Sequence, residues 1–363
     1  MNEIDLLKRV RDDVPQPDPI ALARARQRLL TPPPVRRRPA TLRRTVLAGA
    51  LAATLAGGFL INDVVTKNDA PPPGAAADAG TFLATAARLT GASADAPIPP
   101  GRYRQITQRS QATWNFGPRN TYRGTSLDVT DWWIGSDQKP PYTAISVLGA
   151  KKEFSSETAR KYWAKADPLN VKPQTLRSGD VCGVGTDGGY LAVRPQGAGS
   201  NCMPSWFTPS PDFLARLPRD PGKLLATLRK NDGMAPAPGT TPERADSAAF
   251  DRATLVLASG IAPSDLRAAL YEAVRTIPGI QLQADAVNLD GKSGRAVSLV
   301  EQFGIRKELI IDPRTGQFLG LREVATITAP LNGDGDPMPY KRGDVVKWTS
   351  VSTRITPTRP TIR

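Results

Sequence analysis

The chain of 363 residues has no histidine, only two cysteines and few aromatic side chains. Without histidine it can build neither the Ser–His nor the Cys–His pair that activates a catalytic nucleophile. Two cysteines alone cannot supply the four ligands of an ordinary zinc site. We therefore expect a non-enzymatic protein that carries no cofactor and no metal.

Long apolar runs are also scarce, and only Val46–Ile61 approaches the length of a membrane span. About 20 helical residues cross a hydrocarbon core of roughly 30 Å, and this run reaches that length only if it continues to Val65. The expected organisation is a basic tail at 1–44, a transmembrane helix at 45–65, a Pro/Ala/Gly-rich linker at 66–80 and a domain at 81–357 with a sub-boundary near 234–242.

The charge on either side of this run predicts its direction, because positive residues close to a span stay cytoplasmic and contact the anionic leaflet. Only Lys67 follows the run closely, whereas five arginines precede it: Arg36, Arg37, Arg38, Arg43 and Arg44. We expect a single-pass protein of the cell membrane, with a cytoplasmic N-terminus and an extracytoplasmic C-terminal domain. The alternative is a cleaved twin-arginine export signal, although its leader would be unusually long, and it would export the same domain.

Small residues recur within the apolar run at Gly49, Ala53 and Gly57, so they share one face of the expected helix. Small side chains let two helices approach closely in a bilayer. This face is a candidate helix–helix contact, and the alternative is that alanine and glycine are simply frequent here.

The chain is basic overall, with 48 Lys and Arg against 34 Asp and Glu. Such a balance is typical of nucleic-acid-binding proteins when the charge gathers in one patch. Here the basic residues beyond the span are spread along the chain, and those beside the span have the lipid bilayer as a partner. We therefore expect no nucleic-acid partner.

The tail has apolar residues at helical spacing in two short segments, Ile4–Val10 and Ile20–Leu30, which prolines separate. Helices of this length are marginal on their own. We expect them to fold on a cytoplasmic regulator, or otherwise to remain a weakly ordered leader.

The region beyond the linker alternates between strand and helix patterns. Helices are expected around Phe82–Gly91, at Glu157–Lys165, after the Ser210-Pro211 and Asp220-Pro221 caps, and near Ala245–Leu257 and Pro263–Ile277. Strands are expected at Tyr103–Gln108, Thr121–Ile134, Tyr142–Leu148, Ile280–Val287, Ala296–Phe303, Lys307–Ile311, Phe318–Thr328 and Val345–Ser352. This arrangement predicts an α+β domain in which a curved antiparallel sheet packs against helices.

The two cysteines, Cys182 and Cys202, would lie in an oxidising compartment if the domain is exported. We expect them to form a disulfide across the glycine-rich stretch between them. In that stretch Gly183–Gly188 matches the GxGxxG pattern, but a strand-like segment follows it instead of the helix that a dinucleotide site requires. We therefore expect a turn there.

Two further features, an SxxK match and a pair of tryptophans, each allow a structural and a functional interpretation. Ser136–Lys139 matches the SxxK pattern of acyl enzymes, but Pro140 prevents the helix that this motif opens, so we expect a loop. Trp132 and Trp133 lie next to each other on an expected strand and must point to opposite faces. One ring is expected in the core, and the other is a candidate binding surface.

Several segments together resemble an uncharacterised actinobacterial family of single-pass membrane proteins that are often encoded beside extracytoplasmic-function sigma factors. The segments that carry the resemblance are Ala21–Leu30, Phe213–Leu225, Leu266–Tyr271, Ile277–Ile280 and Ile311–Gly316. The family has no assigned activity, so the resemblance implies no catalytic residue. A looser analogy is to the half-barrel folds of lipoprotein carriers and envelope-stress sensors.

These features leave three functions open. The first is a sensing or binding domain outside the membrane that takes an unknown ligand, with the tail contacting a sigma factor or another cytoplasmic regulator. The second is an exported carrier that holds a lipid or lipoprotein acyl chain between sheet and helices, which an apolar cavity would favour. The third is an extracytoplasmic enzyme whose site has no recognisable motif.

Overall fold

An antiparallel sheet of nine strands is the framework of the part of the chain that the structure describes. The computed structural model describes residues 75–93, 95–139, 142–167, 172–181, 183–185, 205–230, 241–301, 303–330 and 337–361. All of these residues fall within Leu60–Arg363, the second of the two units into which the chain divides.

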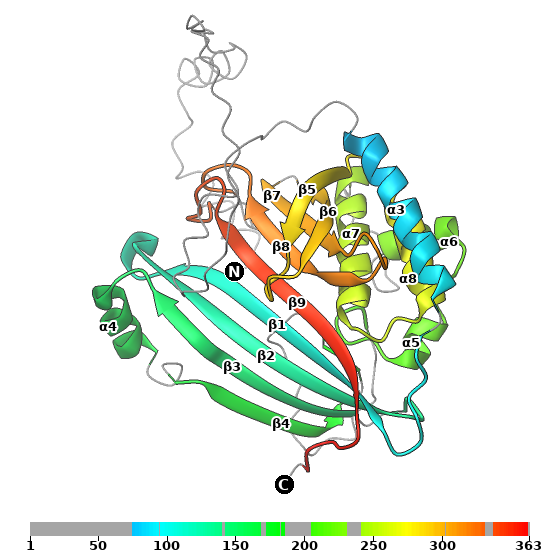
Figure 1. The fold of residues 1–363 in the computed structure, drawn as a ribbon. Helices are drawn as coiled ribbons and strands as arrows, with labels where there is room; N and C mark the ends of the chain where they lie inside the picture. Colours follow the sequence, from blue (N-terminus) through cyan, green and yellow to red (C-terminus); the bar gives the residue numbers. More distant parts are fainter. Residues whose placement is uncertain are drawn as a thin grey trace, which may run out of the picture. The chain divides into compact units, whose positions relative to one another are not determined.

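The strand order is β4-β3-β2-β1-β9-β8-β7-β6-β5 (Figure 1). The strands are β1 Tyr103–Phe116, β2 Tyr122–Gly135, β3 Tyr142–Phe154, β4 Gln174–Val181, β5 Gln281–Val287, β6 Ser293–Val300, β7 Ile305–Ile311, β8 Phe318–Ala325 and β9 Val345–Thr356. Neighbours in the sheet are neighbours along the chain except at β1 and β9, which pair antiparallel from Tyr103 opposite Thr356 to Ala112 opposite Lys347. This single non-local pairing joins four long strands and five later strands into one sheet.

The described helices are α3 Ala75–Ala92, α4 Glu157–Ala166, α5 Pro211–Ala215, α6 Pro221–Arg229, α7 Pro242–Ala258 and α8 Ser264–Val274, with a 3-10 turn at Pro118–Asn120. Four of them, α4 to α7, begin at a side-chain cap. The hydroxyl of Ser210 accepts the Phe213 amide at 3.2 Å, and the carboxylate of Asp220 accepts the Lys223 amide at 2.8 Å. The expected caps of α5 and α6 are therefore confirmed.

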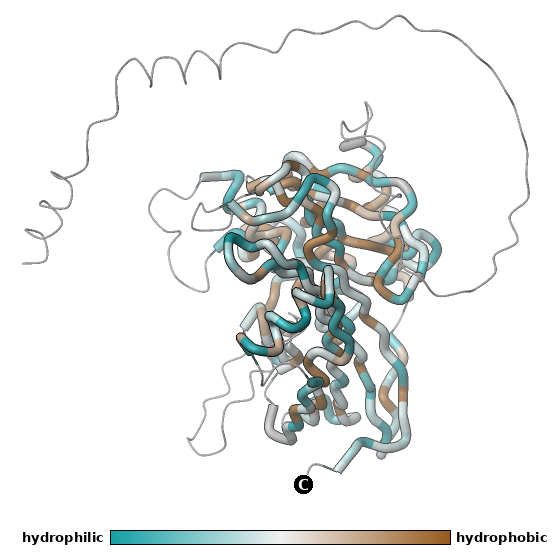
Figure 2. Tube along the Cα trace, turned by 90° about the vertical axis from the view of Figure 1, so that its left-hand side faces the viewer, coloured by the Kyte–Doolittle hydropathy of each residue, from teal (hydrophilic) through white to brown (hydrophobic). Residues whose placement is uncertain are grey.

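Most of the core lies on the side of the sheet that carries Ile106, Trp132 and Leu309, which we call the inner face. Helix α3 packs against α8 and β5, while α6 packs against α7 and α8. The apolar stripe of α8 predicted from sequence is buried, since Leu266 and Leu270 have no exposed surface. In Figure 2 the colour of the tube changes repeatedly along the long strands, as expected for strands with two different faces.

Aromatic side chains join α4 to the far end of the long strands. The ring of Trp163 on α4 lies 5.1 Å from Phe116 and 5.4 Å from Trp114, both on β1. Phe154 of β3 joins the same cluster at 6.4 Å from Trp163. The two contacts with β1 are edge-to-face and the contact with Phe154 is tilted, and such ring pairs stabilise the packing beyond the apolar area that they bury.

A small second core lies on the outer face of β5–β8 and contains Ala286, Ala296, Ile310 and Leu319. The strand ends close over it through side-chain hydrogen bonds. Trp348 of β9 donates its indole N–H to the carbonyl of Val287 at 3.0 Å, and the amide of Asn288 donates to the carbonyl of Leu319 at 2.9 Å. Strong twisting of the short strands brings these positions together.

The predicted α+β class, with a curved antiparallel sheet packed against helices, is confirmed for the described residues. Several bounds differ, and β3 and β9 run past their predicted ends to Phe154 and Thr356. Strand β1 extends to Phe116, β4 was not predicted at all, and α3 begins at Ala75, within the stretch expected as linker. Polar residues at most positions of these strands hide the alternation by which strands are recognised.

None of the described helices is both long enough and apolar enough to cross a bilayer. The predicted transmembrane helix at 45–65 and the tail at 1–44 lie outside the described residues. The arginines at 36–38 and 43–44, the Gly49, Ala53 and Gly57 face, and the Cys182–Cys202 disulfide also lie outside them, so each stays a prediction.

Candidate ligand-binding site

Helix α7 presents one of its faces to the sheet across a cavity. Thr241 caps the helix, because its hydroxyl accepts the Arg244 amide at 3.3 Å. Side chains at three- and four-residue spacing then fall on the face that lines the cavity: Ala248, Asp251, Arg252, Leu255 and Ala258. The opposite face of α7 is buried in the core, where Phe250 is 1% exposed and Val256 has no exposed surface.

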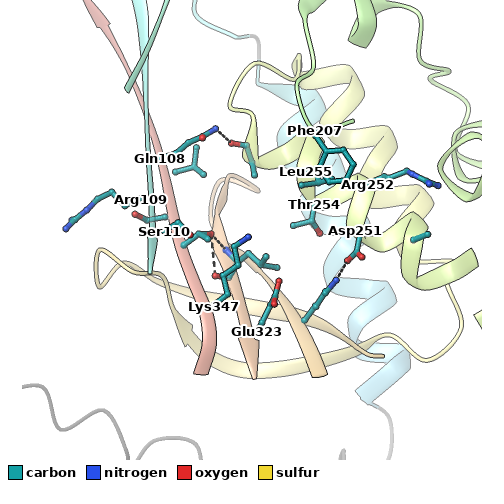
Figure 3. A pocket seen from close by; sticks show the side chains of 17 residues that line it. Gln108, Arg109, Ser110, Phe207, Asp251, Arg252, Thr254, Leu255, Glu323 and Lys347 are labelled. Carbon is teal, nitrogen blue, oxygen red and sulfur yellow. Dashed lines mark hydrogen bonds and ion pairs between the residues drawn. The ribbon is translucent and has the colours of Figure 1, made fainter. Parts of the chain in front are cut away.

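The inner face of the sheet forms the other wall. Its apolar and hydroxyl-bearing side chains are Ser110 of β1, Leu321 of β8, and Thr349 and Val351 of β9. The cavity has a volume of about 450 Å³, within the usual range for small-molecule sites. Figure 3 shows the lining side chains between α7 and the strands, with Phe207 beside Leu255. The ring of Phe207 is 55% exposed, so it stands at the cavity edge.

Gln108 holds the end of α7 at a defined distance from β1. Its side-chain amide donates to the carbonyl of Ala258 at 3.0 Å, and its oxygen accepts the indole N–H of Trp132 at 3.3 Å. Two residues after Ala258, Gly260 packs closely against Ile106 of β1. A Cβ on Gly260 would lie only 2.9 Å from a methyl carbon of Ile106. Both polar ends of the buried Gln108 are satisfied, and the side chain links β1 to the end of α7 beside the cavity.

One end of the cavity is charged. Lys307 of β7 and Lys347 of β9 lie on either side of Glu323 of β8 as cross-strand neighbours. The ammonium of Lys307 pairs with Asp251 of α7 at 2.6 Å and with Glu301 at 2.9 Å. Burial alone would lower the pKa of Lys307, but these carboxylates raise it above its ordinary value. The ammonium therefore stays charged and links α7 to the sheet.

Glu301, which pairs with Lys307, has a pKa that is dominated by burial. Burial raises the pKa of the Glu301 carboxyl above its usual range, and Lys307 only partly opposes this effect. Within the described ranges, no group of three or more His, Cys, Asp or Glu could hold a metal ion. What the cavity offers is an apolar wall from Leu255, Leu321 and Val351 beside a charged rim, which suits an amphipathic ligand.

The motifs weighed from sequence have structural roles where they are described. A Cβ on Gly183 would come within 2.1 Å of the Thr208 carbonyl, so this glycine permits close approach of two chain segments. The remainder of GxGxxG, from Thr186, lies outside the described residues. Ser136–Lys139 is a turn in which the Gln138 amide donates to Gly135, as expected.

The two adjacent tryptophans point to opposite faces, as predicted. Trp132 is 2% exposed and belongs to the core of the inner face. Trp133 is half-buried on the outer face, directly opposite Gln105 of β1.

Sequence reasoning did not find the cavity itself. Its walls come from β1, β7, β8, β9 and α7, which are far apart along the chain. The available signal was weak and lay in polar residues at inner-face positions, such as Gln108 and Ser110, which are 5% exposed. Buried polar side chains in an otherwise apolar row often mark a site.

Comparisons with known proteins give little further information. No family model matches the chain, and none of the curated proteins matches it. Among solved structures, it is similar to a chain in "The complex structure of Pseudomonas aeruginosa MucA/MucB", with 12% identity over 76% of this chain and 57% of that chain. The TM-score is 0.26, so this likeness supports no conclusion about fold or function.

Proposed function

We propose that the described domain is a binding domain that takes an amphipathic small molecule in the cavity beneath α7. The observation that carries this proposal is the cavity of about 450 Å³, with apolar side chains on α7 and the sheet and a charged rim at one end. The apolar part of a ligand would contact Leu255, Leu321 and Val351. Its polar part would lie toward Lys307 and Lys347.

The rim supports a ligand with a polar or anionic head. Two lysines and Arg252 line this part of the cavity together with Asp251 and Glu323. Glu301, which pairs with Lys307, adds a third carboxylate, so the rim is polar and its charges nearly balance. The half-apolar wall agrees with the carrier alternative only in part, because a carrier of bare acyl chains needs no such ion pairs.

The membrane anchor and the regulatory role belong to the same proposal and rest on sequence alone. The arginines at 36–38 and 43–44 support a cytoplasmic tail, and the short amphipathic segments of residues 1–44 support docking on a sigma factor or another regulator. In this arrangement the domain binds its ligand outside the membrane and performs no chemistry. The resemblance to proteins encoded beside sigma factors points the same way.

The cavity is tested with 11-(dansylamino)undecanoic acid, whose fluorescence rises in apolar surroundings. The full chain in nonionic detergent is expected to bind this probe saturably. Leu255→Trp places a bulky ring in the cavity and should abolish binding. Ile327→Trp is the matched control, since Ile327 is 49% exposed and does not line the cavity, and it should bind as the wild type does.

Equal binding by Leu255→Trp and the wild type would rule out this cavity as the site. A second experiment separates sensor from carrier, because a carrier must release the bound probe to phosphatidylcholine vesicles, whereas a sensor need not. A pull-down with residues 1–44 tests the tail. Failure to retain the sigma factor encoded beside this chain would count against the regulatory role.

A further inference from the structure

A second cavity, of about 470 Å³, lies where the end of α3 and the start of α8 meet the inner face of the sheet. Arg104 of β1 and Ile355 of β9 face each other in the register and line it together. Along β1, Ile106 with Gly260 resting on it separates this cavity from the one that Gln108 and Ser110 line. The two cavities share Val351 of β9, but their other lining residues differ.

The positive charge of Arg104 is only weakly balanced by its surroundings. Its guanidinium donates to the carbonyl of Ala96 at 3.0 Å and forms no ion pair with any described residue. Burial lowers the pKa of Arg104, Asp95 opposes this effect, and the positive charge of Arg267 adds to it. A half-buried guanidinium whose hydration is incomplete favours a negatively charged partner.

Asp95 is the one carboxylate among the described residues that line this cavity. Asp95 pairs with Arg267 at 2.9 Å and accepts the backbone amide of Ser264, at the start of α8, at 2.7 Å. Arg267 also donates to the carbonyl of Ala262 at 2.6 Å. The carboxylate of Asp95 thus already caps α8 and neutralises Arg267. Arg104 is left without a carboxylate partner in the described part of the chain, and Arg354 also lines the cavity, so the lining carries a net positive charge.

The remainder of the cavity mixes apolar and polar side chains, and the polar ones are Thr90, Ser93, Thr315, Gln317, Thr353 and Arg354. Leu257, Phe318 and Val351 are each less than 9% exposed, while Ile355 is 40% exposed. A ligand that fits this lining carries an anionic group and a short apolar part. Arg presents a planar fork of donors that matches phosphate and carboxylate oxygens.

We propose that this cavity binds an oxyanion, either free phosphate or the phosphate of a small amphipathic monoester, between the guanidiniums of Arg104 and Arg267. The site does not depend on the cavity beneath α7, and either one can exist without the other. The apolar wall distinguishes the two sources of phosphate, because only the monoester can contact Leu257 and Phe318.

Isothermal titration of the full chain with inorganic phosphate and with monobutyl phosphate, at physiological ionic strength, tests the site. Both should bind saturably, and monobutyl phosphate should bind more tightly if the apolar wall is used. Arg104→Gln should weaken binding about tenfold, since one charge-assisted hydrogen bond is lost. Arg160→Gln is the control: it also removes a guanidinium, but Arg160 lies on α4, where it pairs with Glu157, and does not line the cavity.

Asp95→Asn provides a test with the opposite sign. Asparagine can still cap α8, but it removes the internal negative charge, so phosphate affinity should rise several-fold. This variant keeps the proposal testable if Arg104→Gln fails to fold. Absence of phosphate binding in the wild type, equal weakening by Arg160→Gln, or lower affinity in Asp95→Asn would each overturn the proposal.

Discussion

Glu308 is a fully buried carboxylate that two arginines hold on the outer face of the short strands. It pairs with Arg306 at 2.8 Å and with Arg322 of the adjacent strand at 2.6 Å. Its own side chain is 1% exposed, and the arginines are 16% and 15% exposed. Because the carboxylate compensates two cations at once, its loss leaves both partners with incomplete hydration.

Glu308→Gln should therefore lower the free energy of unfolding by about 3 kcal/mol, the scale for breaking a buried ion pair. Urea denaturation followed by circular dichroism measures this loss. Glu157→Gln is the control, because it breaks the exposed pair with Arg160 and should leave stability unchanged. Similar effects of the two substitutions would show that the triad contributes no more than a surface pair.

Asp344 makes stability depend on pH. Burial disfavours its charged form, but hydrogen bonds from Arg123 and from the Lys341 amide, the latter at 2.7 Å, outweigh this and lower its pKa below the usual range. A lowered folded-state pKa contributes stability that is fully present above about pH 4, where the unfolded carboxyl titrates, and is lost as pH falls through the folded value.

Asp344→Asn should be less stable than the wild type at pH 7, and the difference should shrink steadily as the pH falls below about 4. Urea titrations of both proteins between pH 7 and pH 3 measure it. A difference that stays constant over this range would mean that the Asp344 carboxylate does not contribute through its charge.

The hairpin between β7 and β8 is an element whose turn was predicted but whose contacts were not. Asp312–Gln317 has the expected turn chemistry, and the Gly316 amide donates to Asp312 at 2.9 Å. The carbonyl of Gly316 accepts the hydroxyls of Thr90 at 3.1 Å and Tyr271 at 2.9 Å. The turn is thereby fastened to both α3 and α8.

Gly316→Ala should destabilise the protein by about 3 kcal/mol. The residue has φ 71°, and a Cβ would come within 2.5 Å of the Ala86 carbonyl. Gly291→Ala is the control, since Gly291 has φ 76° but open space around it, so it should cost only about 1 kcal/mol. Thermal unfolding compares the two, and equal losses would show that backbone strain alone accounts for the effect.

Elements with strong local signals were predicted well. Ser210 and Asp220 cap α5 and α6, and the apolar stripe of α8 is buried. The sequence did not predict strand β4 or the part of β1 that follows Gln108. Residues there, such as Gln111, Thr113 and Asn115, show no alternation of apolar and polar side chains. The strand conformation of β4 depends on its pairing with β3, and that of the end of β1 depends on its pairing with β2.

Membrane attachment concerns the whole molecule. If residues 45–65 span the bilayer, the full chain should sediment with membranes and resist extraction by carbonate, while a chain that begins at residue 75 should remain in the supernatant. Recovery of the full chain in the supernatant would contradict the predicted anchor.

Neither cavity could be predicted from the sequence. The cavity beneath α7 needs β1 and β9 side by side, although residues such as Ser110 and Thr349 are far apart in the chain. The second cavity needs Arg104, Asp95 and Arg267 to meet where three elements end. Each of these residues is individually an ordinary charged or polar side chain.

The sequence alone predicted the helix starts and turns that have strong local signals. Caps, proline positions, turns and apolar spacing depend only on neighbours within a few residues. The absence of histidine likewise excluded whole classes of catalytic pair. The pairing of β1 with β9, the charged end beneath α7 and the shared carboxylate of Asp95 emerged only in the folded chain. These contacts join segments that are distant in the sequence. Their free energies depend on the burial and the charged neighbours that several segments create together when the chain folds.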